Sequence, residues 1–221
     1  MVRGLVFDFD GLIVDSEMPV YRAWSEVYGR FGQELPLGVW KTVVGQGPGY
    51  FDPVADLGRR LQRELDRDVL RAQYRARQLE LMAAEPVLPG VREWRDQAVA
   101  MGVRLGVASN SRQGWVTGNL ERLGLDGFQC IRCFDDVGRA KPEPDIYLAV
   151  LDCLGLEAAE VIALEDSPSG VQAAKTAGLF CVAVPGLLTA DADYSAADLV
   201  LTSLAERTFA EVARLAGGVP D

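Results

Sequence analysis

The chain has 221 residues, of which 49% are hydrophobic and 24% are charged, proportions typical of soluble globular proteins. Its 32 acidic and 22 basic residues give a net charge of −10, which disfavours a nucleic-acid partner because phosphate backbones are also negative. No apolar run approaches the roughly 20 residues that span a bilayer, so we expect no membrane partner. The N-terminal sequence "MVRGLVFDFDG" lacks the layout of a signal peptide, and we expect a cytoplasmic protein.

The sequence contains no histidine, which excludes Ser–His and Cys–His catalysis and leaves carboxylates, Lys, Tyr or Cys to move protons. Four cysteines are present, and Cys130 and Cys133 form a C-x-x-C pair. No second pair or histidine completes a zinc site. We therefore expect the cysteines to be buried thiols in a reducing compartment.

The first predicted strand, "GLVFDF", is a short apolar run that leads into Asp8 and Asp10. Buried charges are unfavourable unless they are paired, so these carboxylates need partners elsewhere in the chain. From residue 16 to residue 86 the patterns are helical, with a Gly/Pro-rich interruption at 45–50. We expect a core domain of residues 1–15 and 87–221, with a helical cap domain of residues 16–86 inserted after the first strand.

Apolar strands and helices alternate in the rest of the chain. Further strands are predicted at "VRLGVAS" (103–109), "EVIALED" (160–166), "LFCVAVPG" (179–186) and "ADLVLTS" (197–203). Nearly continuous apolar strands separated by helices indicate a parallel sheet that is covered on both faces. The predicted fold class is α/β, a doubly wound, Rossmann-like parallel sheet with the inserted helical domain.

Polar side chains follow the predicted strands at their carboxyl ends, where open parallel sheets bind ligands. These residues are Asp8, Asp10, Ser109, Asn110, Glu165 and Asp166, and Lys141 lies in the loop "GRAKPEPD". Four gathered carboxyl groups require a cation, and hard oxygen ligands select Mg²⁺. Mg²⁺ and Lys141 would together neutralise a phosphoryl group. Without histidine, one carboxylate would attack phosphorus and another would move the proton.

Each of these motifs also has a structural interpretation when it is taken alone. A D-x-D pair is common on surfaces, and a lone lysine such as Lys141 is usually solvated. The sequence "EDSPSG" is also a typical helix start, with Ser167 as the N-cap and Pro168 at the first helical position. The occurrence of all the motifs at strand ends favours a functional site.

The segments "DFDGLIVDSE", "VASNS", "KPEPDIY" and "LEDSPSGVQAAKTAG" resemble the four signature motifs of the haloacid dehalogenase superfamily. More narrowly, they are similar to the branch that holds β-phosphoglucomutases and small-molecule phosphatases such as 2-deoxyglucose-6-phosphate phosphatases. The resemblance extends over essentially the whole chain, including the inserted cap. It implies a Mg²⁺ cofactor and an aspartyl-phosphate intermediate.

By motif position, the resemblance implies that Asp8 is the nucleophile. Asp10 would protonate the leaving oxygen and then activate water. Mg²⁺ would be bound by Asp8, the backbone carbonyl of Asp10 and Asp166, with Glu165 either a ligand or a neighbouring partner. The Asp8 and Asp10 pair argues against a dehalogenase, because haloacid dehalogenases lack the second aspartate.

The resemblance also implies that Ser109 and Lys141 hold the transferring phosphoryl group. The expected substrate contacts are Ser109, Asn110, Lys141, Arg112 and Gln46, and further cap candidates are Tyr21, Trp24 and Tyr50. The expected partner is a small phosphorylated metabolite, and we expect the protein to act as a monomer.

β-Phosphoglucomutases have a histidine at the position of Val20 and an arginine in the cap loop that matches "VGQGPG", and this chain has neither. Two phosphates need two cationic sites, and only the one around Lys141 is evident. Arg75 and Arg77 in the last cap helix are candidates for a second site, but a solvated basic helix face is the favoured interpretation of this pair. We therefore predict a Mg²⁺-dependent phosphatase that acts on a small monoester, a sugar or polyol phosphate. The alternatives are a sugar-phosphate mutase and a non-catalytic binding protein.

Overall fold

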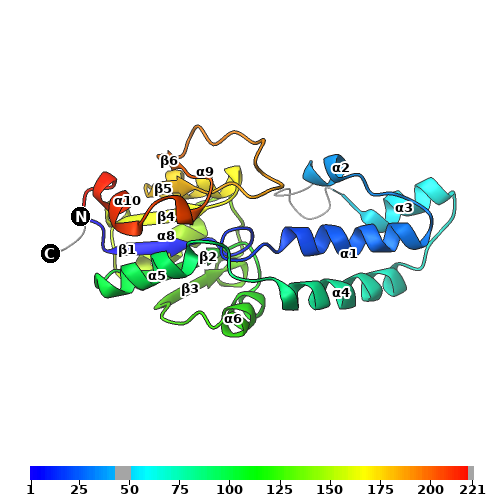
Figure 1. Ribbon diagram of the computed structural model, residues 1–221, viewed down its shortest axis with the longest axis horizontal. Coiled ribbons are helices and arrows are strands. Elements are labelled where there is room, and N and C mark those ends of the chain that lie inside the picture. The colour runs from blue at the N-terminus through cyan, green and yellow to red at the C-terminus, as the bar shows by residue number, and fades with distance from the viewer. Residues whose placement is uncertain (43–50, 219–221) are drawn as a thin grey trace. The chain divides into compact units, whose positions relative to one another are not determined.

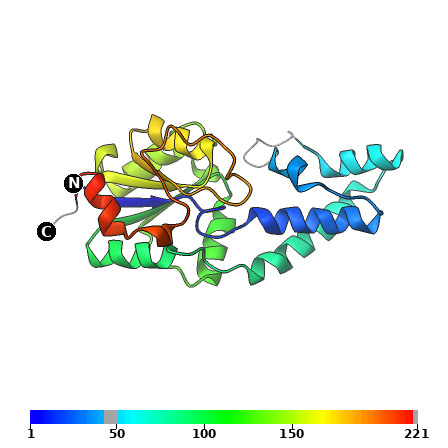
Figure 2. The ribbon, with the colours of Figure 1, turned by 45° about the horizontal axis from the view of Figure 1, so that its top comes forward.

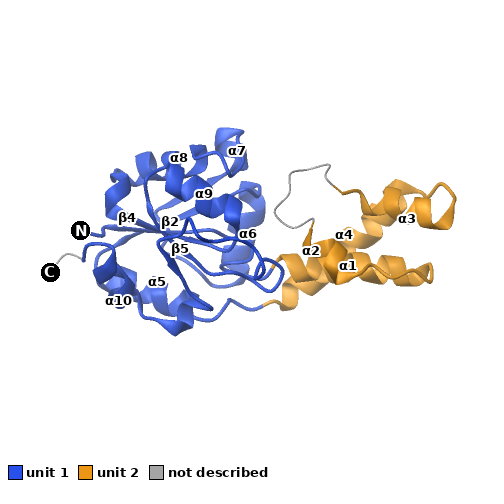
Figure 3. Ribbon diagram, turned by 90° about the horizontal axis from the view of Figure 1, so that it is seen from above, with its two compact units in different colours: residues 1–15, 86–221 blue, residues 16–85 orange. Residues whose placement is uncertain are grey.

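The computed structural model describes residues 1–42 and 51–218 of the chain. The chain divides into two compact units (Figure 3). One unit consists of Met1–Asp15 and Pro86–Asp221, and the other consists of Ser16–Glu85. The chain returns to the first unit between Glu85 and Pro86, one residue before the 86/87 boundary expected from the sequence.

The first unit is built on a six-stranded parallel sheet with the strand order β3-β2-β1-β4-β5-β6 (Figure 1). The strands are β1 (Gly4–Phe7), β2 (Arg104–Ser109), β3 (Cys130–Cys133), β4 (Val161–Glu165), β5 (Phe180–Ala183) and β6 (Leu199–Val200). After β1, the chain adds β2 and β3 on one side of it and then β4, β5 and β6 on the other side, so the strand order reverses at β1. The predicted α/β, doubly wound fold is confirmed.

The register of the central strands brings their ends to one edge of the sheet. Phe7 of β1 pairs with Val107 of β2 and with Leu164 of β4. Asp8, Ala108 and Glu165, which follow these three positions, therefore lie at the same level of the sheet. Every residue of β1 and β4 is buried, so polar side chains at this edge begin only where the apolar runs end.

Helices cover both faces of the sheet. α5 (Val91–Ala100) and α10 (Phe209–Leu215) lie on one face, and α8 (Asp145–Leu154) and α9 (Pro168–Thr176) lie on the other (Figure 2 and Figure 3). α6 (Gln113–Arg122) and the short α7 (Phe134–Val137) flank β3. α8 buries Ile146, Val150 and Leu154, whose spacing places them on one helix face against the apolar strands.

The edge strand β3 is absent from the elements predicted above. Its sequence "CIRC" is short and includes Arg132, so it gives no clear periodic signal. Cys130 of this strand forms a disulfide with Cys153 of α8, and their Cα atoms are 6.1 Å apart. The expectation of free thiols is therefore wrong for this pair, because packing of α8 on β3 brings together cysteines far apart in the sequence. Cys133 and Cys181 are free and buried, as expected.

The second unit is helical throughout its described residues. It contains α1 (Glu17–Arg30), α2 (Leu37–Lys41), α3 (Pro53–Leu61) and α4 (Arg67–Ala84). α1 and α4 pack against each other (Figure 1), and the ring of Trp24 stacks on that of Tyr74 with 4.5 Å between centroids. Asp52 and Asp66 cap the N-termini of α3 and α4 by accepting backbone N–H bonds.

The two chain segments that connect the units are joined to each other inside the first unit. Val14 and Val87 form an antiparallel bridge, and Leu88 N donates to Ile13 O at 2.9 Å. Among the helices of the described residues, none has both the length and the apolar character needed to cross a membrane.

Candidate active site

The chain turns sharply as it leaves β1, and this turn sets the positions of Asp8 and Asp10. Ile13 N donates to Phe9 O at 3.0 Å, and Gly11 N donates to Val14 O at 2.8 Å. Gly11 has a φ of 84°, and a Cβ atom there would lie 2.0 Å from Oδ2 of Asp166. The turn therefore requires glycine both for its backbone angle and for the close approach of the Asp166 carboxylate.

Lys141 reaches the end of β1 from the loop before α8. Its Nζ lies 2.6 Å from Oδ1 of Asp8, 2.6 Å from Oε1 of Glu165 and 2.8 Å from the carbonyl oxygen of Ala108. These three acceptors match the three hydrogens of the ammonium group. The Lys141 side chain is only 2% exposed, so the interpretation of this residue as a solvated lysine is wrong.

Glu165 is fully buried at the end of β4 and contacts Lys141 through one oxygen. Its Oε1 also accepts a hydrogen bond from the hydroxyl of Tyr147 on α8. Its Oε2 is buried and has no hydrogen-bond partner among the described residues. Gly170, in the first turn of α9, packs so closely that a Cβ atom there would lie 1.7 Å from Oε2. Ser167 and Pro168 do begin this helix, so the structural interpretation of "EDSPSG" is also correct.

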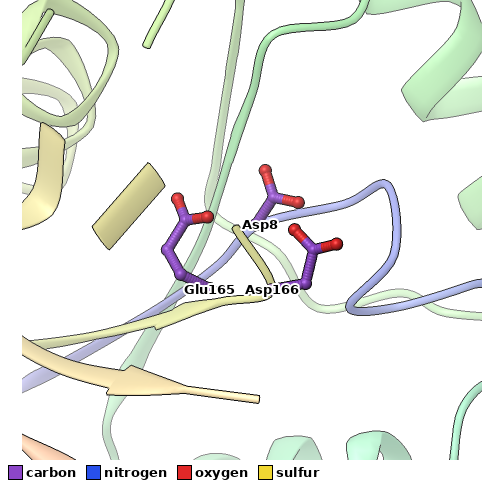
Figure 4. Close-up of side chains that lie close together, drawn as sticks. All are labelled: Asp8, Glu165 and Asp166. Carbon is purple, nitrogen blue, oxygen red and sulfur yellow. The ribbon is translucent and has the colours of Figure 1, made fainter. Parts of the chain in front are cut away.

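Asp8, Glu165 and Asp166 form an acidic cluster in which one carboxylate oxygen of each lies within 4.8 Å of the others (Figure 4). Burial, together with the charges of Glu165 and Asp10, raises the pKa of Asp8 to about 7 even though Lys141 opposes the shift. Burial alone would lower the pKa of Lys141, but the charges of Asp8 and Glu165 outweigh it and raise that pKa.

The acidic cluster suits a hard divalent cation. The single positive charge of Lys141 does not balance three ionised carboxylates. The pKa of Asp8 is raised mainly by burial and further by the charge of Glu165. Carboxylate oxygens are the ligands that Mg²⁺ prefers. The donor set therefore fits the expected Mg²⁺. Glu165 is engaged by Lys141 through Oε1, and the assignment of Asp8 and Asp166 as side-chain ligands stays a prediction.

The side chain of Asp10 is hydrogen-bonded to two residues near the start of α6. Its Oδ2 accepts a hydrogen bond from Ser111 Oγ at 2.5 Å, and its Oδ1 accepts one from Trp115 Nε1 at 3.0 Å. Three of the four carboxyl groups expected to gather thus form the cluster, and the fourth is held separately. The expected metal contact of Asp10 involves its backbone carbonyl and stays a prediction.

The loop after β2 supports both Lys141 and Asp10. Ser109 is buried, and its Oγ accepts a hydrogen bond from Ser111 N at 3.0 Å. Asn110 clamps the Lys141 backbone: its Oδ1 accepts from Lys141 N at 2.7 Å and its Nδ2 donates to Lys141 O at 3.5 Å. Arg112 is exposed at the N-cap of α6. Substrate contacts by these residues stay predictions.

The candidate residues of the cap have partners within their own unit. The Tyr21 hydroxyl donates to Leu35 O at 3.0 Å, and Trp24 is buried against Tyr74. Arg77 makes a forked ion pair with Glu26, in which its Nε lies 2.8 Å from Oε2, and this disfavours Arg77 as a second phosphate site. Gln46 and Tyr50 lie outside the described residues.

Sequence reasoning missed Tyr147, Ser111 and Trp115. Tyr147 stands inside the motif "KPEPDIY" as a polar-tipped aromatic on the apolar face of α8, which is a usable signal. Ser111 is the last residue of the motif "SNS", and its polar side chain just after a predicted strand is also a usable signal. Trp115 follows four residues later in an ordinary helical stretch, and nothing in its local sequence points to Asp10.

Comparison with known proteins agrees with this geometry. The sequence profile described as haloacid dehalogenase-like hydrolase matches residues 5–184. The chain belongs to the haloacid dehalogenase-like hydrolase family. The suspected superfamily resemblance is thereby confirmed, and with it the expectation of an enzyme rather than a non-catalytic binding protein.

Relatives in the haloacid dehalogenase-like family align over nearly the full length of the chain. The protein YhcW of Bacillus subtilis (strain 168) is 39% identical, with 95% of this chain and 96% of that protein covered. Validoxylamine A 7'-phosphate phosphatase of Streptomyces hygroscopicus subsp. limoneus is 32% identical, with 93% and 96% covered. A haloacid dehalogenase-family hydrolase from Deinococcus radiodurans R1, crystallised with bound phosphate and sodium, superposes with a TM-score of 0.81 at 28% identity, covering 99% of this chain and 97% of that one.

Proposed function

We propose that the protein is a Mg²⁺-dependent phosphatase that hydrolyses a small phosphate monoester, a sugar or polyol phosphate, through an aspartyl-phosphate on Asp8. The observation that carries the proposal is the buried contact of Lys141 with both Asp8 and Glu165, beside Asp166. Family membership and a relative named as a phosphatase of a 7'-phosphate support the same chemistry.

In the proposed reaction, the Asp8 carboxylate attacks phosphorus and the ester oxygen leaves. Asp10 donates a proton to that oxygen, then takes a proton from the water that attacks the aspartyl-phosphate, so that phosphate is released and Asp8 is regenerated. Lys141 fixes Oδ1 of Asp8 at 2.6 Å, which leaves Oδ2 as the attacking atom. The Ser109 hydroxyl would bind a phosphoryl oxygen.

Asp8, Asp166 and the backbone carbonyl of Asp10 would hold Mg²⁺, which when bound neutralises charge on the phosphoryl oxygens. We assign Glu165 as a partner of Lys141 rather than as a ligand, because its Oε1 accepts from Lys141 and Tyr147 and its Oε2 lies against Gly170 in the first turn of α9. We further propose that the protein works as a cytoplasmic monomer, as the N-terminal sequence, the lack of a long apolar run and the acidic composition led us to expect.

Phosphate release from a panel of sugar and polyol phosphates, measured with Mg²⁺ and with EDTA, tests the proposal. Asp8→Asn is expected to lower kcat by roughly 10³-fold or more, because it removes the nucleophile. Its thermal unfolding should stay a single transition, which shows that the fold is retained. Full turnover by Asp8→Asn would refute the mechanism.

A mutase would transfer the phosphoryl group to a sugar hydroxyl instead of to water. Glucose 1-phosphate with a trace of the bisphosphate distinguishes the two activities. Free phosphate is the expected product. Formation of glucose 6-phosphate without free phosphate would overturn the phosphatase assignment, and so would a lack of conversion of every ester in the panel.

A further inference from the structure

Both carboxylate oxygens of Asp10 are held by side chains to which the sequence motifs give no role. Ser111 Oγ lies 2.5 Å from Oδ2, and Trp115 Nε1 lies 3.0 Å from Oδ1. Ser111 lies between β2 and α6 and Trp115 lies in the first turn of α6, and both are about a hundred residues from Asp10 in the sequence. The indole N–H can only donate, so an acceptor such as a carboxylate oxygen is its natural partner.

The two donors are anchored independently of Asp10. Ser111 N donates to Ser109 Oγ at 3.0 Å, and Ser111 O accepts from Phe134 N at 3.2 Å. Trp115 O accepts from the side chain of Asn119 at 2.9 Å, one turn further along α6. Trp115 itself is half-buried, and its backbone belongs to α6. Asp10 lies in the turn after β1.

We infer that Trp115, assisted by Ser111, is a positioning residue that orients the Asp10 carboxylate for proton transfer; this rests on the proposed phosphatase function. A general acid must lie within about 3 Å of the oxygen that it protonates, and a carboxylate fixed at both oxygens has lost its freedom to rotate. Fixing it before the substrate arrives removes that ordering from the reaction barrier. Because Trp115 acts through Asp10, its removal should slow the reaction most for substrates whose leaving oxygen must be protonated.

The test compares two esters that differ in their need for a proton. An alkyl ester, the best sugar phosphate from the panel, has a leaving oxygen that must be protonated. p-Nitrophenyl phosphate releases a stable phenolate that needs no proton. The value of kcat/KM reports the steps up to departure of the leaving group, so loss of Asp10 orientation should lower it for the alkyl ester alone.

Trp115→Phe keeps the ring and removes the N–H donor. We expect its kcat/KM for the sugar phosphate to fall about tenfold or more, while that for p-nitrophenyl phosphate stays within about twofold. With the aryl ester, nitrophenolate should appear in a burst, because Asp10 also activates the water that removes phosphate from Asp8. Ser111→Ala should change the same ratio in the same direction, and it serves as the second variant if Trp115→Phe does not fold.

Trp94→Phe is the matched control. Trp94 Nε1 also donates two hydrogen bonds, to Leu204 O and Arg207 O at 2.8 Å each, but it lies in α5 against α10. Loss of these two hydrogen bonds in Trp94→Phe should lower the melting temperature and leave the ratio of the two kcat/KM values unchanged. A Trp115→Phe ratio equal to that of the wild type, with full activity or with equal losses on both esters, would overturn the inference. A wild-type protein that hydrolyses neither ester overturns the proposed function and the inference together.

Discussion

Lys141 is the residue on which the site depends most, because one ammonium group compensates two buried carboxylates. Its side chain is 2% exposed, while those of Asp8 and Glu165 are 9% and 0% exposed. Moving these charges out of water opposes folding, and their mutual contacts offset that penalty only while all members are present. Removal of one partner is therefore expected to be worse than removal of two.

Lys141→Met should abolish turnover and lower the free energy of unfolding by about 3–5 kcal/mol, because Asp8 and Glu165 would stay buried without a cationic partner. The double variant Lys141→Met/Glu165→Gln should recover about 1 kcal/mol or more of that loss. Urea denaturation in EDTA measures both values. Strictly additive losses for Lys141→Met and Glu165→Gln would show that the two residues do not stabilise each other.

The sequence alone predicted which residues stand at the strand ends, since apolar runs that stop at Asp8, Ser109 and Glu165 are visible without coordinates. It did not predict that Asn110 would clamp the Lys141 backbone or that Trp115 would reach Asp10. Those contacts depend on how α6 and the loop before α8 pack, and local patterns carry no information on such packing.

At the scale of elements, the N-terminus of α9 is fitted to the side chain at the end of β4. Ser167 caps the helix, and Gly170 in its first turn lies against Glu165 Oε2. The close approach leaves no space for a methyl group. The position of α9 and that of the Glu165 carboxylate are thus coupled.

Gly170→Ala should destabilise the protein by about 1–3 kcal/mol and lower kcat, because the new Cβ would displace a carboxylate that also holds Lys141. Gly118→Ala in α6 is the control, since nothing lies within 4 Å of a Cβ at that position. It should stabilise the helix by about 0.5–1 kcal/mol without changing kcat. Equal effects of the two substitutions on melting temperature and kcat would contradict the coupling of α9 to Glu165.

Element prediction succeeded where a strand is a buried apolar run, as in β1, β2, β4 and β5. It failed for β3, which is four residues long and lies at the sheet edge. Its partner Cys153 is on a different element, so the disulfide of Cys130 was equally invisible. Short edge strands are specified by their neighbours more than by their own pattern.

At the scale of the whole molecule, an acidic chain concentrates further negative charge at one sheet edge. The net charge is −10, and burial raises the pKa of Asp8 from the ordinary 3.8 to about 7. At pH values between 3.8 and about 7, the Asp8 carboxyl group is protonated in the folded, metal-free protein and ionised in the unfolded chain. This contribution to stability is fully present below about pH 4 and is lost as the pH rises through about 7.

The stabilisation by Mg²⁺ should therefore grow with pH. The ion binds ionised Asp8, so the rise in melting temperature on adding saturating Mg²⁺ should be larger at about pH 8 than at about pH 5.5. Differential scanning fluorimetry in EDTA and in Mg²⁺ measures this difference. Asp8→Asn should remove the pH dependence of the Mg²⁺ effect. The same rise at both pH values in the wild-type protein would argue against metal binding through Asp8.

The bridge between Val14 and Val87 has a consequence for how this architecture can be altered. The inserted unit begins and ends at two chain segments that are already hydrogen-bonded to each other, with Leu88 N bound to Ile13 O. With respect to the sheet, Ser16–Glu85 is one long insertion between two chain segments that are hydrogen-bonded to each other. The entropy cost of closing such a loop rises only slowly with the number of residues in it. We therefore expect that helical units of other sizes and surfaces can be exchanged at this point while β1 and the acidic cluster keep their positions.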